Sequence, residues 1–563
     1  MIGAATSVPD PALRTTAQRI ARMLQELGIR EAYGVCGREI AHMWSALLQT
    51  RGSEDAIATM HARHENGAGF CAIGSWTQTG RPAAVFVTTA PGLANVITSL
   101  EVARATSAQL VLLSPLTPAS ERGRLGIQAT GPGGFLPADL YTEGRIFDVV
   151  SMLESPAQLP ALAGRLASGF AGDGAFMAHI AIPTDLQGEP TAVVPAIPAR
   201  RRAVPAPPPE LADEIVELMV AEPFAVWVGW GARRHAAAIR ELLDRTGAPA
   251  VSSPRGLGIV DAHRQFVGVT GNGGHPSVPA ELARWAPQRT LVLGTRLAEA
   301  TSGWLPELVP PKGLIHIDID VGVFARAYPQ VPTLEVPADI GAVLAAILAR
   351  SERLVHRPPP APAPPPARLT LVPSSPRPIH PAAVMAAIQR QVVDATDMPV
   401  LADASSSMFW ATRQLHFREP GRWFVEGHVG CMGAMGAAVV GSAVGRGGSA
   451  LAIVGDGAMH MQDEINTAVR YGTRAIWVVL NDSGLGIVRT GMQAAGLGAH
   501  DADYPPTDFA AVARAKGARA LRVTRERDLD RALRTAVHAT GPILLDVVVD
   551  PAAPAPIGAR ARR

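Results

Sequence analysis

Lysine is almost absent from this sequence. Lys312 and Lys516 are the only lysines among 51 basic residues, and arginine supplies the rest. No Gly-Lys-Ser or Gly-Lys-Thr occurs, which excludes the phosphate-binding loop of ATPases. Lys312 opens an apolar run and Lys516 follows a helical pattern, so neither is placed as a Schiff-base nucleophile. This argues against pyridoxal-phosphate chemistry.

Cysteine, net charge and long apolar runs are also scarce. Three cysteines, none in a Cys-x-x-Cys pair, argue against a disulfide framework and for a reducing cytoplasm. Apolar runs such as 450–454 and 476–480 are far shorter than a membrane span. The N-terminus has no basic region followed by an apolar stretch, so we expect no secretory signal. A net charge of +2 gives no electrostatic footprint for nucleic acid or an anionic membrane.

The length and the proline content predict the organisation of the chain. At 563 residues the chain is too long for one compact core, and proline-rich stretches at about 195–209 and 358–378 predict extended linkers. The predicted segments are 1–190, 205–350 and 375–555, with linkers at about 191–204 and 351–374. Each segment alternates short apolar runs with helical patterns. We therefore predict the α/β class, with three consecutive doubly wound parallel-sheet domains that bind ligands at the carboxyl ends of their strands.

The strongest local signal lies in the third segment, where two apolar runs end in polar residues. The first run leads into Gly-Asp-Gly at 455–457, and the next ends in Asn-Asp-Ser-Gly at 481–484. Since the carboxyl ends of parallel strands meet at one edge of a sheet, Asp456 and Asp482 are expected there together. Two carboxylates and a loop carbonyl leave positions around Mg²⁺ for phosphate oxygens. The alternative is a sheet whose loops carry Gly, Asp and Asn only as turn residues.

The stretch 455–482 resembles the thiamine-diphosphate motif of the superfamily that contains acetolactate synthase, benzoylformate decarboxylase and pyruvate oxidase. The family motif usually ends in Asn-Asn rather than Asn-Asp and is usually one residue longer. Aspartate keeps an oxygen ligand and adds a negative charge. The residues that the resemblance assigns to Mg²⁺ are Asp456, Asp482 and the carbonyl of Gly484. Those that it assigns to the cofactor in this stretch are Gly455, Gly457 and Asn481.

Two further stretches of the third segment resemble the same family. Gly-Ala-Met-Gly at 433–436 resembles its Gly-x-Met-Gly motif, in which a bulky apolar side chain props the cofactor into a V shape. The resemblance gives this role to Met435, and gives binding of the pyrimidine edge to the backbone of Gly433 and Met435. A turn upstream resembles the diphosphate-binding turn, with Ser406 and Ser407 as phosphate donors. Outside such a pattern, a methionine among glycines is more often core filler.

A candidate catalytic acid lies in the first segment. Thiamine diphosphate must lose the proton on its thiazolium C2, and a buried carboxylic acid hydrogen-bonded to the pyrimidine N1′ promotes this. Glu65 follows a strand-like run and opens an apolar helix. His-Glu-Asn-Gly-Ala at 64–68 resembles the family's His-Glu-x-x-Ala motif, which implies this role for Glu65. The alternative is an exposed glutamate that stabilises the start of a helix.

The resemblance also assigns a glycine-rich loop that faces the thiazolium. Thr88 and Thr89 stand in this loop at catalytic positions, where relatives carry histidine or small polar residues. Gly92 of the same loop is assigned to the cofactor. Gln128 is aligned with an active-site glutamine of the synthases.

Two features leave alternatives open. Arg38 follows a loop resembling the family's substrate loop, and it is either a catalytic-site clamp for a substrate carboxylate or one half of an ion pair with Glu39. In the middle segment, Gly-Trp-Gly at 229–231 is a partial dinucleotide fingerprint whose third glycine is replaced by Arg234. Relatives hold flavin (FAD), another nucleotide or nothing in this domain, and no motif here supports FAD.

The resemblance covers essentially the whole chain and implies an acetolactate-synthase-like carboligase. Such an enzyme decarboxylates a small 2-oxo acid and adds the resulting enamine to a second carbonyl compound. The alternatives are a decarboxylase that releases an aldehyde, a nicotinamide or flavin oxidoreductase that uses the middle segment, and an inactive cofactor-binding scaffold. The three domains would be pyrimidine-binding, central and diphosphate-binding. In this family one active site takes its glutamate and its diphosphate domain from different subunits, which implies a homodimer or homotetramer.

Overall fold

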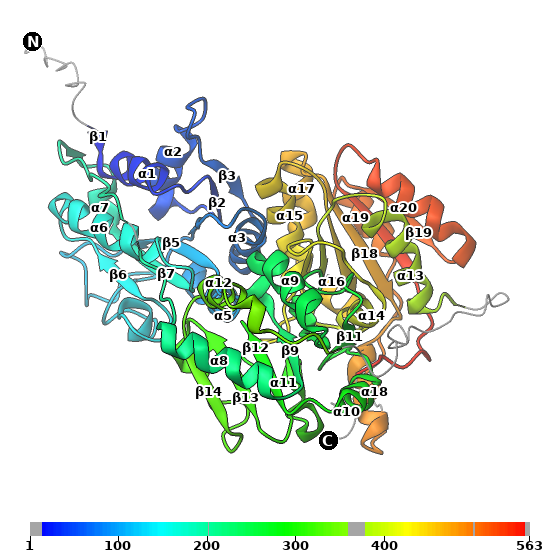
Figure 1. The fold of residues 1–563 in the computed structure, drawn as a ribbon. Coiled ribbons are helices and arrows are strands. Elements are labelled where there is room, and N and C mark those ends of the chain that lie inside the picture. Colours follow the sequence, from blue (N-terminus) through cyan, green and yellow to red (C-terminus); the bar gives the residue numbers. More distant parts are fainter. Residues whose placement is uncertain (1–13, 201, 358–377, 499–500, 558–563) are drawn as a thin grey trace, which may run out of the picture. The chain divides into compact units, whose positions relative to one another are not determined.

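The computed structural model describes residues 14–200, 202–357, 378–498 and 501–557 (Figure 1). Contacts within the chain divide it into two compact units: 1–202 with 440–447, and 203–439 with 448–563. The predicted linker at 351–374 lies mostly outside the described residues, as does most of the N-terminal stretch for which no secretory signal is expected. The bounds of the three segments therefore stay a prediction.

The first unit contains a six-stranded parallel sheet. Its strands are β2 (Glu31–Gly34), β3 (Ala58–His61), β4 (Ala83–Phe86), β5 (Gln109–Leu116), β6 (Val149–Met152) and β7 (Phe176–Pro183). They lie in the order β3-β2-β4-β5-β7-β6. β5 and β7 are buried along their whole length, as expected for the inner strands of a parallel sheet. A short antiparallel pair, β1 (Arg14–Thr15) with β8 (Pro190–Thr191), joins the start and the end of this part of the chain.

Helix α3 (Glu65–Thr79) sets the position of the glutamate predicted to be catalytic. It begins soon after β3, where His64 caps it by accepting a hydrogen bond from the Asn66 N–H at 3.1 Å. Small residues let it lie close to α5 (Ile97–Thr106), since a Cβ on Gly69 would stand 2.0 Å from Ser99 Oγ. The other helices of this unit are α1 (Thr16–Glu26), α2 (Ala41–Leu48), α4 (Ala90–Asn95), α6 (Leu159–Phe170) and α7 (Thr184–Gln187).

The second unit contains two more six-stranded parallel sheets. The central sheet consists of β9 (Phe224–Val228), β10 (Ala250–Ser252), β11 (Phe266–Val269), β12 (Arg289–Leu293), β13 (Leu314–Asp318) and β14 (Thr333–Pro337), in the order β11-β10-β9-β12-β13-β14. The last sheet consists of β15 (Val400–Ala402), β16 (Trp423–Val425), β17 (Ala450–Gly455), β18 (Ala475–Asn481), β19 (Arg519–Val523) and β20 (Ile543–Val548), in the order β16-β15-β17-β18-β20-β19. Three parallel sheets with helices between the strands confirm the predicted fold class.

The helices of the last sheet determine where its functional groups lie. Helix α14 (Ser406–Gln414) starts shortly after β15, and α16 (Asp456–Met459) starts directly after β17, so both begin at the carboxyl edge of the sheet. The other helices of the second unit are α8 (Pro209–Ala221), α9 (Ala236–Thr246), α10 (Val278–Trp285), α11 (Glu299–Ser302), α12 (Ile340–Leu348), α13 (Pro381–Ile388), α17 (Glu464–Tyr471), α18 (Gly486–Ala494), α19 (Phe509–Ala515) and α20 (Leu529–Val537). Helix α15 (Ala434–Arg446) has residues in both units. Within the described ranges, no helix combines the length and the apolar character needed to cross a membrane.

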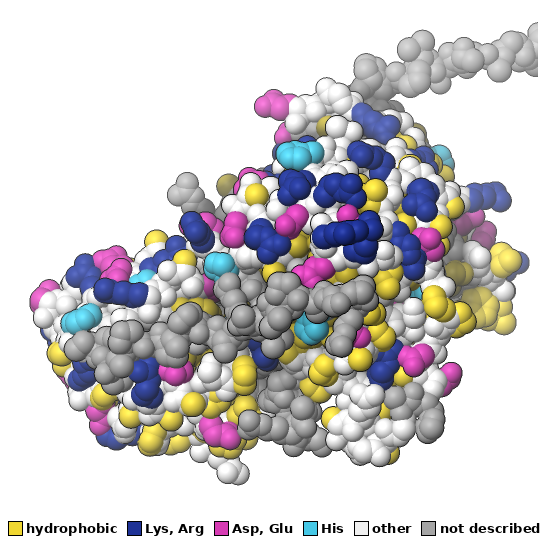
Figure 2. All heavy atoms as spheres, turned by 90° about the vertical axis from the view of Figure 1, so that its right-hand side faces the viewer, with side chains coloured by type: hydrophobic (Ala, Val, Ile, Leu, Met, Phe, Trp, Pro, Cys, Tyr) yellow, Lys and Arg dark blue, Asp and Glu magenta, His cyan; other side chains and the backbone are white. Residues whose placement is uncertain are grey.

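Charges of both signs are mixed on the molecular surface. The face in Figure 2 gathers arginine and lysine side chains, with acidic side chains among them. Near α20, Arg525 and Arg531 both bind Asp528, at 2.9 and 3.1 Å, and Arg390 binds Asp530 at 3.0 Å. Exposed pairs of this kind contribute at most about 1 kcal/mol each to stability.

Within the second unit, loops of the central domain pack closely on loops of the last domain. Arg240 donates to the carbonyl oxygens of Gly258 and Arg418 at 2.8 and 2.7 Å. A Cβ on Gly258, whose φ is +94°, would stand 2.3 Å from the carbonyl oxygen of Glu419. Only glycine fits this approach of two backbones.

Asp261 lies in the same contact region between the central and the last domain. Its Oδ2 accepts from the Phe417 N–H at 3.4 Å, whereas the described residues offer no hydrogen-bond partner for its buried Oδ1. Burial raises the pKa of Asp261 to about 7, and backbone N–H groups, including that of Gly258, oppose the rise. Because the pKa is raised in the folded state, the folded protein holds this proton more tightly than the unfolded chain. Asp261 therefore stabilises the fold fully below about pH 4, and this contribution is lost as the pH rises towards 7.

We expect Asp261→Asn to remove this pH dependence, because asparagine carries no charge at either end of the range. Tm measured by calorimetry at about pH 5 and about pH 8 should fall less in the variant than in the wild type. Asp530→Asn, which changes an exposed carboxylate of the same unit, is the control. An equal fall in Tm for Asp261→Asn and the wild type would contradict this prediction, because it would show that ionisation of Asp261 does not lower the free energy of unfolding.

Candidate active site

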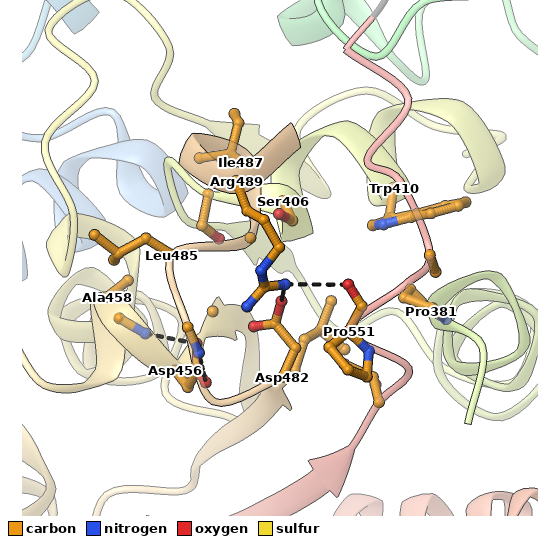
Figure 3. A pocket seen from close by; sticks show the side chains of 18 of the residues that line it. Pro381, Ser406, Trp410, Asp456, Ala458, Asp482, Leu485, Ile487, Arg489 and Pro551 are labelled. Atoms are coloured by element: carbon orange, nitrogen blue, oxygen red, sulfur yellow. Dashed lines mark hydrogen bonds and ion pairs between the residues drawn. The ribbon is translucent and has the colours of Figure 1, made fainter. Parts of the chain in front are cut away.

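A pocket lies at the carboxyl ends of β15, β17 and β18, the edge at which the sequence predicts the metal site (Figure 3). Its volume, including space that is open to solvent, is about 580 Å³. Residues predicted to bind metal or cofactor are part of its lining: Ser406, Gly455, Asp456, Gly457, Asp482 and Gly484. The structure therefore brings the two predicted carboxylates to one pocket.

Asp456 is the first residue of α16 and is buried. Its Oδ1 accepts from the Gly457 N–H at 2.8 Å, and its Oδ2 accepts from the Gly484 N–H at 3.3 Å. Burial raises the pKa of Asp456, and hydrogen bonds from Tyr504 and the backbone oppose the rise. The carboxylate thus ties the end of β17 to the loop that follows β18.

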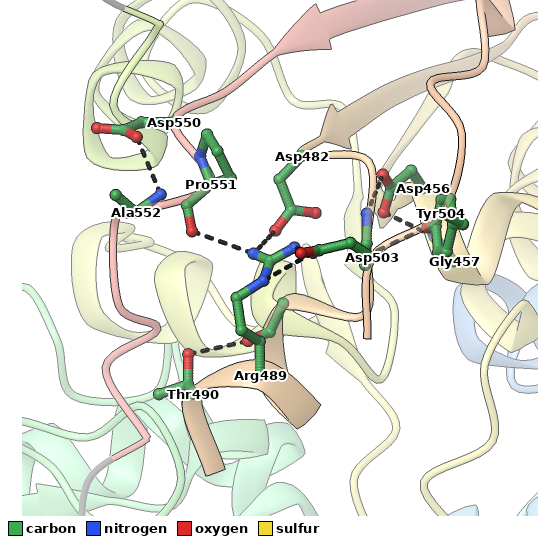
Figure 4. Close-up of polar contacts among 12 residues, drawn as sticks. Asp456, Gly457, Asp482, Arg489, Thr490, Asp503, Tyr504, Asp550, Pro551 and Ala552 are labelled. Atoms are coloured by element: carbon green, nitrogen blue, oxygen red, sulfur yellow. Dashed lines mark hydrogen bonds and ion pairs between the residues drawn. The ribbon is translucent and has the colours of Figure 1, made fainter. Parts of the chain in front are cut away.

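Asp482 directly follows β18 and binds Arg489 of α18, with 3.1 Å between Oδ2 and Nη1 (Figure 4). Burial and then the negative charge of Asp456 raise the pKa of Asp482 to about 7, and Arg489 acts in the opposite direction. Each carboxylate is therefore close enough to disfavour the charge of the other. A bound divalent cation relieves this kind of repulsion.

The third predicted ligand, the carbonyl of Gly484, lies on the same loop. Its oxygen accepts from the Tyr504 hydroxyl at 3.4 Å, and a carbonyl oxygen has a second lone pair. In the described part of the chain, no group of three or more His, Cys, Asp or Glu side chains could hold a metal ion. Two carboxylates and one carbonyl, completed by phosphate oxygens, fit the preferences of Mg²⁺ rather than those of zinc.

The glycines around Asp456 leave no room for a side chain. A Cβ on Gly455 would stand 2.9 Å from Ser405 Oγ, and a Cβ on Gly457 would stand 2.8 Å from Leu485 Cδ2. Glycine therefore lets the pocket walls close around the carboxylate, as expected for a loop whose backbone approaches a ligand.

The turn at 405–407 contains three serines, of which two line the pocket and one does not. Ser405 and Ser406 line the pocket at the start of α14, where a helix N-terminus favours an anion. Ser407 is fully buried, and its hydroxyl donates to the carbonyl oxygens of Asp403 and Ile453 at 3.2 and 3.1 Å. The role of Ser407 as a phosphate donor stays a prediction, and in this structure its one O–H group is used within the protein. Ser405 was not among the residues predicted to line the site.

Asn481 does not reach the pocket. Its amide donates to Asp546 Oδ1 at 2.8 Å and to the carbonyl oxygen of Thr507 at 2.9 Å. Asn481 is not part of the pocket lining, and its role in binding the cofactor stays a prediction. In a strand, successive side chains point to opposite faces, which separates Asn481 from Asp482.

Met432 rather than Met435 lines this pocket, and the predicted role of Met435 in supporting the cofactor ring stays a prediction. Met435 lies in α15, fully buried, and is not part of the lining, whereas Met432 is. The N–H groups of Gly433 and Met435 donate to the Asp403 carboxylate at 2.9 and 2.8 Å, so this backbone could bind a cofactor ring only through its carbonyl groups. The sequence did contain the signal for Met432, because Gly-Cys-Met-Gly at 430–433 has the same Gly-x-Met-Gly spacing.

In the first unit, Glu65 is the first residue of α3 and is only 7% exposed. The alternative of a solvent-exposed glutamate at a helix start is therefore wrong. Its Oε2 accepts from Asn95 Nδ2 at 3.0 Å, and its Oε1 lies 3.3 Å from the place that a Cβ on Gly92 would take. Asn95 stands in the glycine-rich loop, but no sequence pattern singles it out as the partner of Glu65.

The glycine-rich loop brings several predicted residues together. A Cβ on Gly92 would also stand 3.2 Å from Thr88 Cγ2, so Thr88 and Glu65 flank the same glycine. The Thr89 hydroxyl donates to Gln128 Oε1. Gln128 lies on an exposed loop in the left-handed conformation, with φ at +55°. Four of the predicted catalytic residues of this unit therefore lie in or beside this loop: Glu65, Thr88, Thr89 and Gln128.

Arg38 stands apart from them. Its side chain is 96% exposed, and its Nε lies 3.9 Å from Glu39 Oε1. An ion pair as exposed as this one contributes little to the stability of the fold. The loop that precedes it does reach the site, since a Cβ on Gly37 would stand 2.2 Å from Thr88 Oγ1. Both predicted roles of Arg38, the clamp and the ion pair, stay open.

The glycines of the central sheet form no phosphate cradle. They follow β9 at the point where the strand order reverses. The Gly231 N–H donates to the Gly294 carbonyl at 3.0 Å, and a Cβ on Gly229 would stand 2.4 Å from Thr295 Cβ. These contacts close the space between the ends of β9 and β12, and α9 starts only at Ala236. A dinucleotide site needs that space and a helix start beside it, so this geometry lends no support to FAD or nicotinamide.

Comparisons with known proteins cover most of the chain. Family models of the thiamine pyrophosphate enzymes match three parts: the N-terminal TPP binding domain at 14–131, the central domain at 213–347 and the C-terminal TPP binding domain at 403–547. A Mycobacterium tuberculosis protein described as "Putative acetolactate synthase large subunit IlvB2" is 30% identical over 554 residues, which cover 92% of this chain and 95% of that protein. The "Probable 2-ketoarginine decarboxylase AruI" of Pseudomonas aeruginosa is 28% identical over 554 residues, covering 95% of this chain and 94% of that protein.

A solved structure has the same fold. The thiamine diphosphate-dependent 4-hydroxybenzoylformate decarboxylase of Rhodococcus jostii RHA1 superposes with a TM-score of 0.81. The match covers 95% of this chain and 99% of that chain, at 19% sequence identity. At this identity the likeness concerns the fold alone.

The two methionines allow a matched test of the pocket wall. We expect Met435→Ala to cost about 2–5 kcal/mol of stability, because it empties a fully buried site. We expect Met432→Ala to change Tm little and to weaken binding of thiamine diphosphate, because it removes part of the pocket wall. Calorimetry gives both quantities. Weaker cofactor binding by folded Met435→Ala, with Met432→Ala unchanged, would return the role to Met435.

Proposed function

The chain belongs to the thiamine pyrophosphate enzyme family and is acetolactate synthase-like, and from this premise we propose that it decarboxylates a 2-oxo acid and joins the remaining fragment to a second carbonyl compound. The observation that carries the proposal is the pocket that holds Asp456 and Asp482, within the part matched by the C-terminal TPP binding domain. The near full-length similarity to a protein described as an acetolactate synthase supports the joining step.

We propose that this pocket binds the diphosphate group together with Mg²⁺. Asp456, Asp482 and the carbonyl of Gly484 would hold the cation. The Ser406 hydroxyl and the N-terminus of α14 would bind phosphate oxygens, and Met432 would support the cofactor from the pocket wall. Two neighbouring carboxylates, whose pKa values are both raised by burial and, for Asp482, also by the charge of Asp456, supply the donors and the charge that a hard dication needs.

Glu65 is the proposed proton-transfer residue. Bound thiamine diphosphate would supply the nucleophilic carbon and the electron sink that decarboxylation of a 2-oxo acid needs. The part of Glu65 is to exchange a proton with the pyrimidine N1′ through Oε1, while Asn95 holds Oε2 at 3.0 Å. Gly92 leaves room beside Oε1, and the bond from Thr89 to Gln128 fixes the neighbouring loop.

A 2-oxo acid decarboxylase is the second candidate. It is favoured by one observation, the 28% identity over nearly the whole chain to a protein described as a 2-ketoarginine decarboxylase. The two candidates share the first half of the reaction and differ in what receives the electron pair. A proton gives a free aldehyde, and a second carbonyl compound gives a larger hydroxy ketone.

We also propose that the protein forms a homodimer or a homotetramer with shared active sites. The loop that carries Gln128 exposes three large apolar side chains, Leu125, Ile127 and Phe135, and Ile127 is 95% exposed. Gln128 itself is bound to the loop of predicted catalytic threonines, so a second copy that covers these side chains would lie next to the site. The proposed location is the reducing cytoplasm, in keeping with the free cysteines Cys36, Cys71 and Cys431.

The first experiment is a substrate panel with protein freed of cofactor and then given thiamine diphosphate and Mg²⁺. A set of 2-oxo acids is offered with and without an aldehyde or a second 2-oxo acid as acceptor. We expect CO₂ release together with an acyloin or acetohydroxy acid, and no release when the cofactor is left out. Free aldehyde without a joined product, under every acceptor, would favour the decarboxylase.

A second experiment replaces the proposed proton-transfer residue. We expect Glu65→Gln to lower turnover by at least about 100-fold, since positioned proton transfer contributes about that much or more. The variant should fold and bind cofactor as the wild type does. Glu26→Gln, which changes an exposed partner of Arg22 in the same unit, is the control. Full activity of Glu65→Gln would contradict the proposed mechanism and favour an inactive scaffold.

A further inference from the structure

Arg489 of α18 connects three separate segments at the edge of the pocket (Figure 4). Its Nη1 donates to Asp482 Oδ2 and to the carbonyl oxygen of Pro551, both at 3.1 Å, and its Nε donates to Asp503 Oδ1 at 2.9 Å. The side chain is only 11% exposed. Because a guanidinium is planar and its donors are fixed, three acceptors on three segments hold it in one orientation.

These contacts distinguish the two oxygens of Asp482. Oδ2 faces Arg489 and the first turn of α18, where a Cβ on Gly486 would stand 2.5 Å from it. Neither contact involves Oδ1. An aspartate held through one oxygen keeps the other in a fixed place, and this is how residues behind a metal ligand orient it. Arg489 also adds a positive charge beside two carboxylates that disfavour each other.

We propose that Arg489 is the positioning residue for Asp482: it holds Oδ2, so that Oδ1 binds the divalent cation, and it offsets the charge of the second carboxylate of the site. This inference rests on the proposed function, because the ligand role of Asp482 belongs to it. The Pro551 carbonyl shares Nη1 with Asp482, and Asp503 binds Nε, so these two residues hold the guanidinium in place beside Asp482 (Figure 4).

The experiment measures metal affinity rather than turnover. Mn²⁺ replaces Mg²⁺, and free Mn²⁺ is followed by electron paramagnetic resonance during titration of the protein with thiamine diphosphate present. We expect Arg489→Gln to weaken Mn²⁺ binding by about 10–100-fold, the usual effect of losing a residue that orients a metal ligand. Arg489→Lys keeps the positive charge but loses the planar guanidinium with its fixed donors. Its Mn²⁺ affinity should lie between those of Arg489→Gln and the wild type.

A double-mutant cycle separates positioning from a merely structural role. In an Asp482→Asn background the neutral side chain still offers Oδ1 and has no charge to offset, so Arg489→Gln should change Mn²⁺ affinity much less than in the wild type. A merely structural arginine would lower Tm and weaken Mn²⁺ binding equally in both backgrounds. Arg390→Gln, which breaks an exposed pair with Asp530, is the matched control.

Two outcomes overturn the inference in different ways. Mn²⁺ binding by the wild type that is unchanged in Arg489→Gln overturns the positioning role and leaves the proposed metal site intact. Failure of the wild type itself to bind Mn²⁺ with the cofactor overturns the proposed metal site and, with it, this role.

Discussion

Repulsion between two carboxylates buried at adjoining strand ends is the constraint around which this site is organised. Asp456 and Asp482 each directly follow a fully buried strand, which places both at the carboxyl edge of the sheet. Neighbouring groups reduce the free-energy cost of holding these two carboxylates close together. Backbone N–H groups bind Asp456, and a buried arginine binds Asp482. What remains is a pocket that favours a cation between the acidic side chains and an anion at the start of α14.

Much of this arrangement follows from short-range patterns. β17 and β18 are buried along their whole length because both faces of a parallel sheet are covered, and apart from Asn481 at the end of β18 they have no polar side chain, which makes them visible as apolar runs in the sequence. The polar residues that end such runs must meet at one edge, so the order of residues alone is enough to predict that Asp456 and Asp482 lie together. Glu65 is identified by the resemblance of 64–68 to the family's His-Glu-x-x-Ala motif, and the strand and apolar helix around it predict only its place at a helix start.

The predicted site residues that do not line the pocket share one property: a partner distant in the sequence decides where each side chain or backbone group goes. Ser407 is held by Ile453, Asn481 by Asp546, and the N–H group of Met435 by Asp403. No local pattern specifies such a partner. The methionine was a further problem, since two Gly-x-Met-Gly motifs overlap at Gly433, and the start of α15 at Ala434 decides which of them becomes core.

The pairing of β1 with β8 has a consequence for how such a chain can be assembled. The chain enters and leaves the first sheet at the same point, and the hydrophobic core beneath it is drawn almost entirely from residues 17–186. A segment that is closed in this way, with its ends side by side, behaves as an interchangeable module. Recombination could move it to another position in a gene, or split it off as a separate polypeptide, without breaking a strand of its sheet.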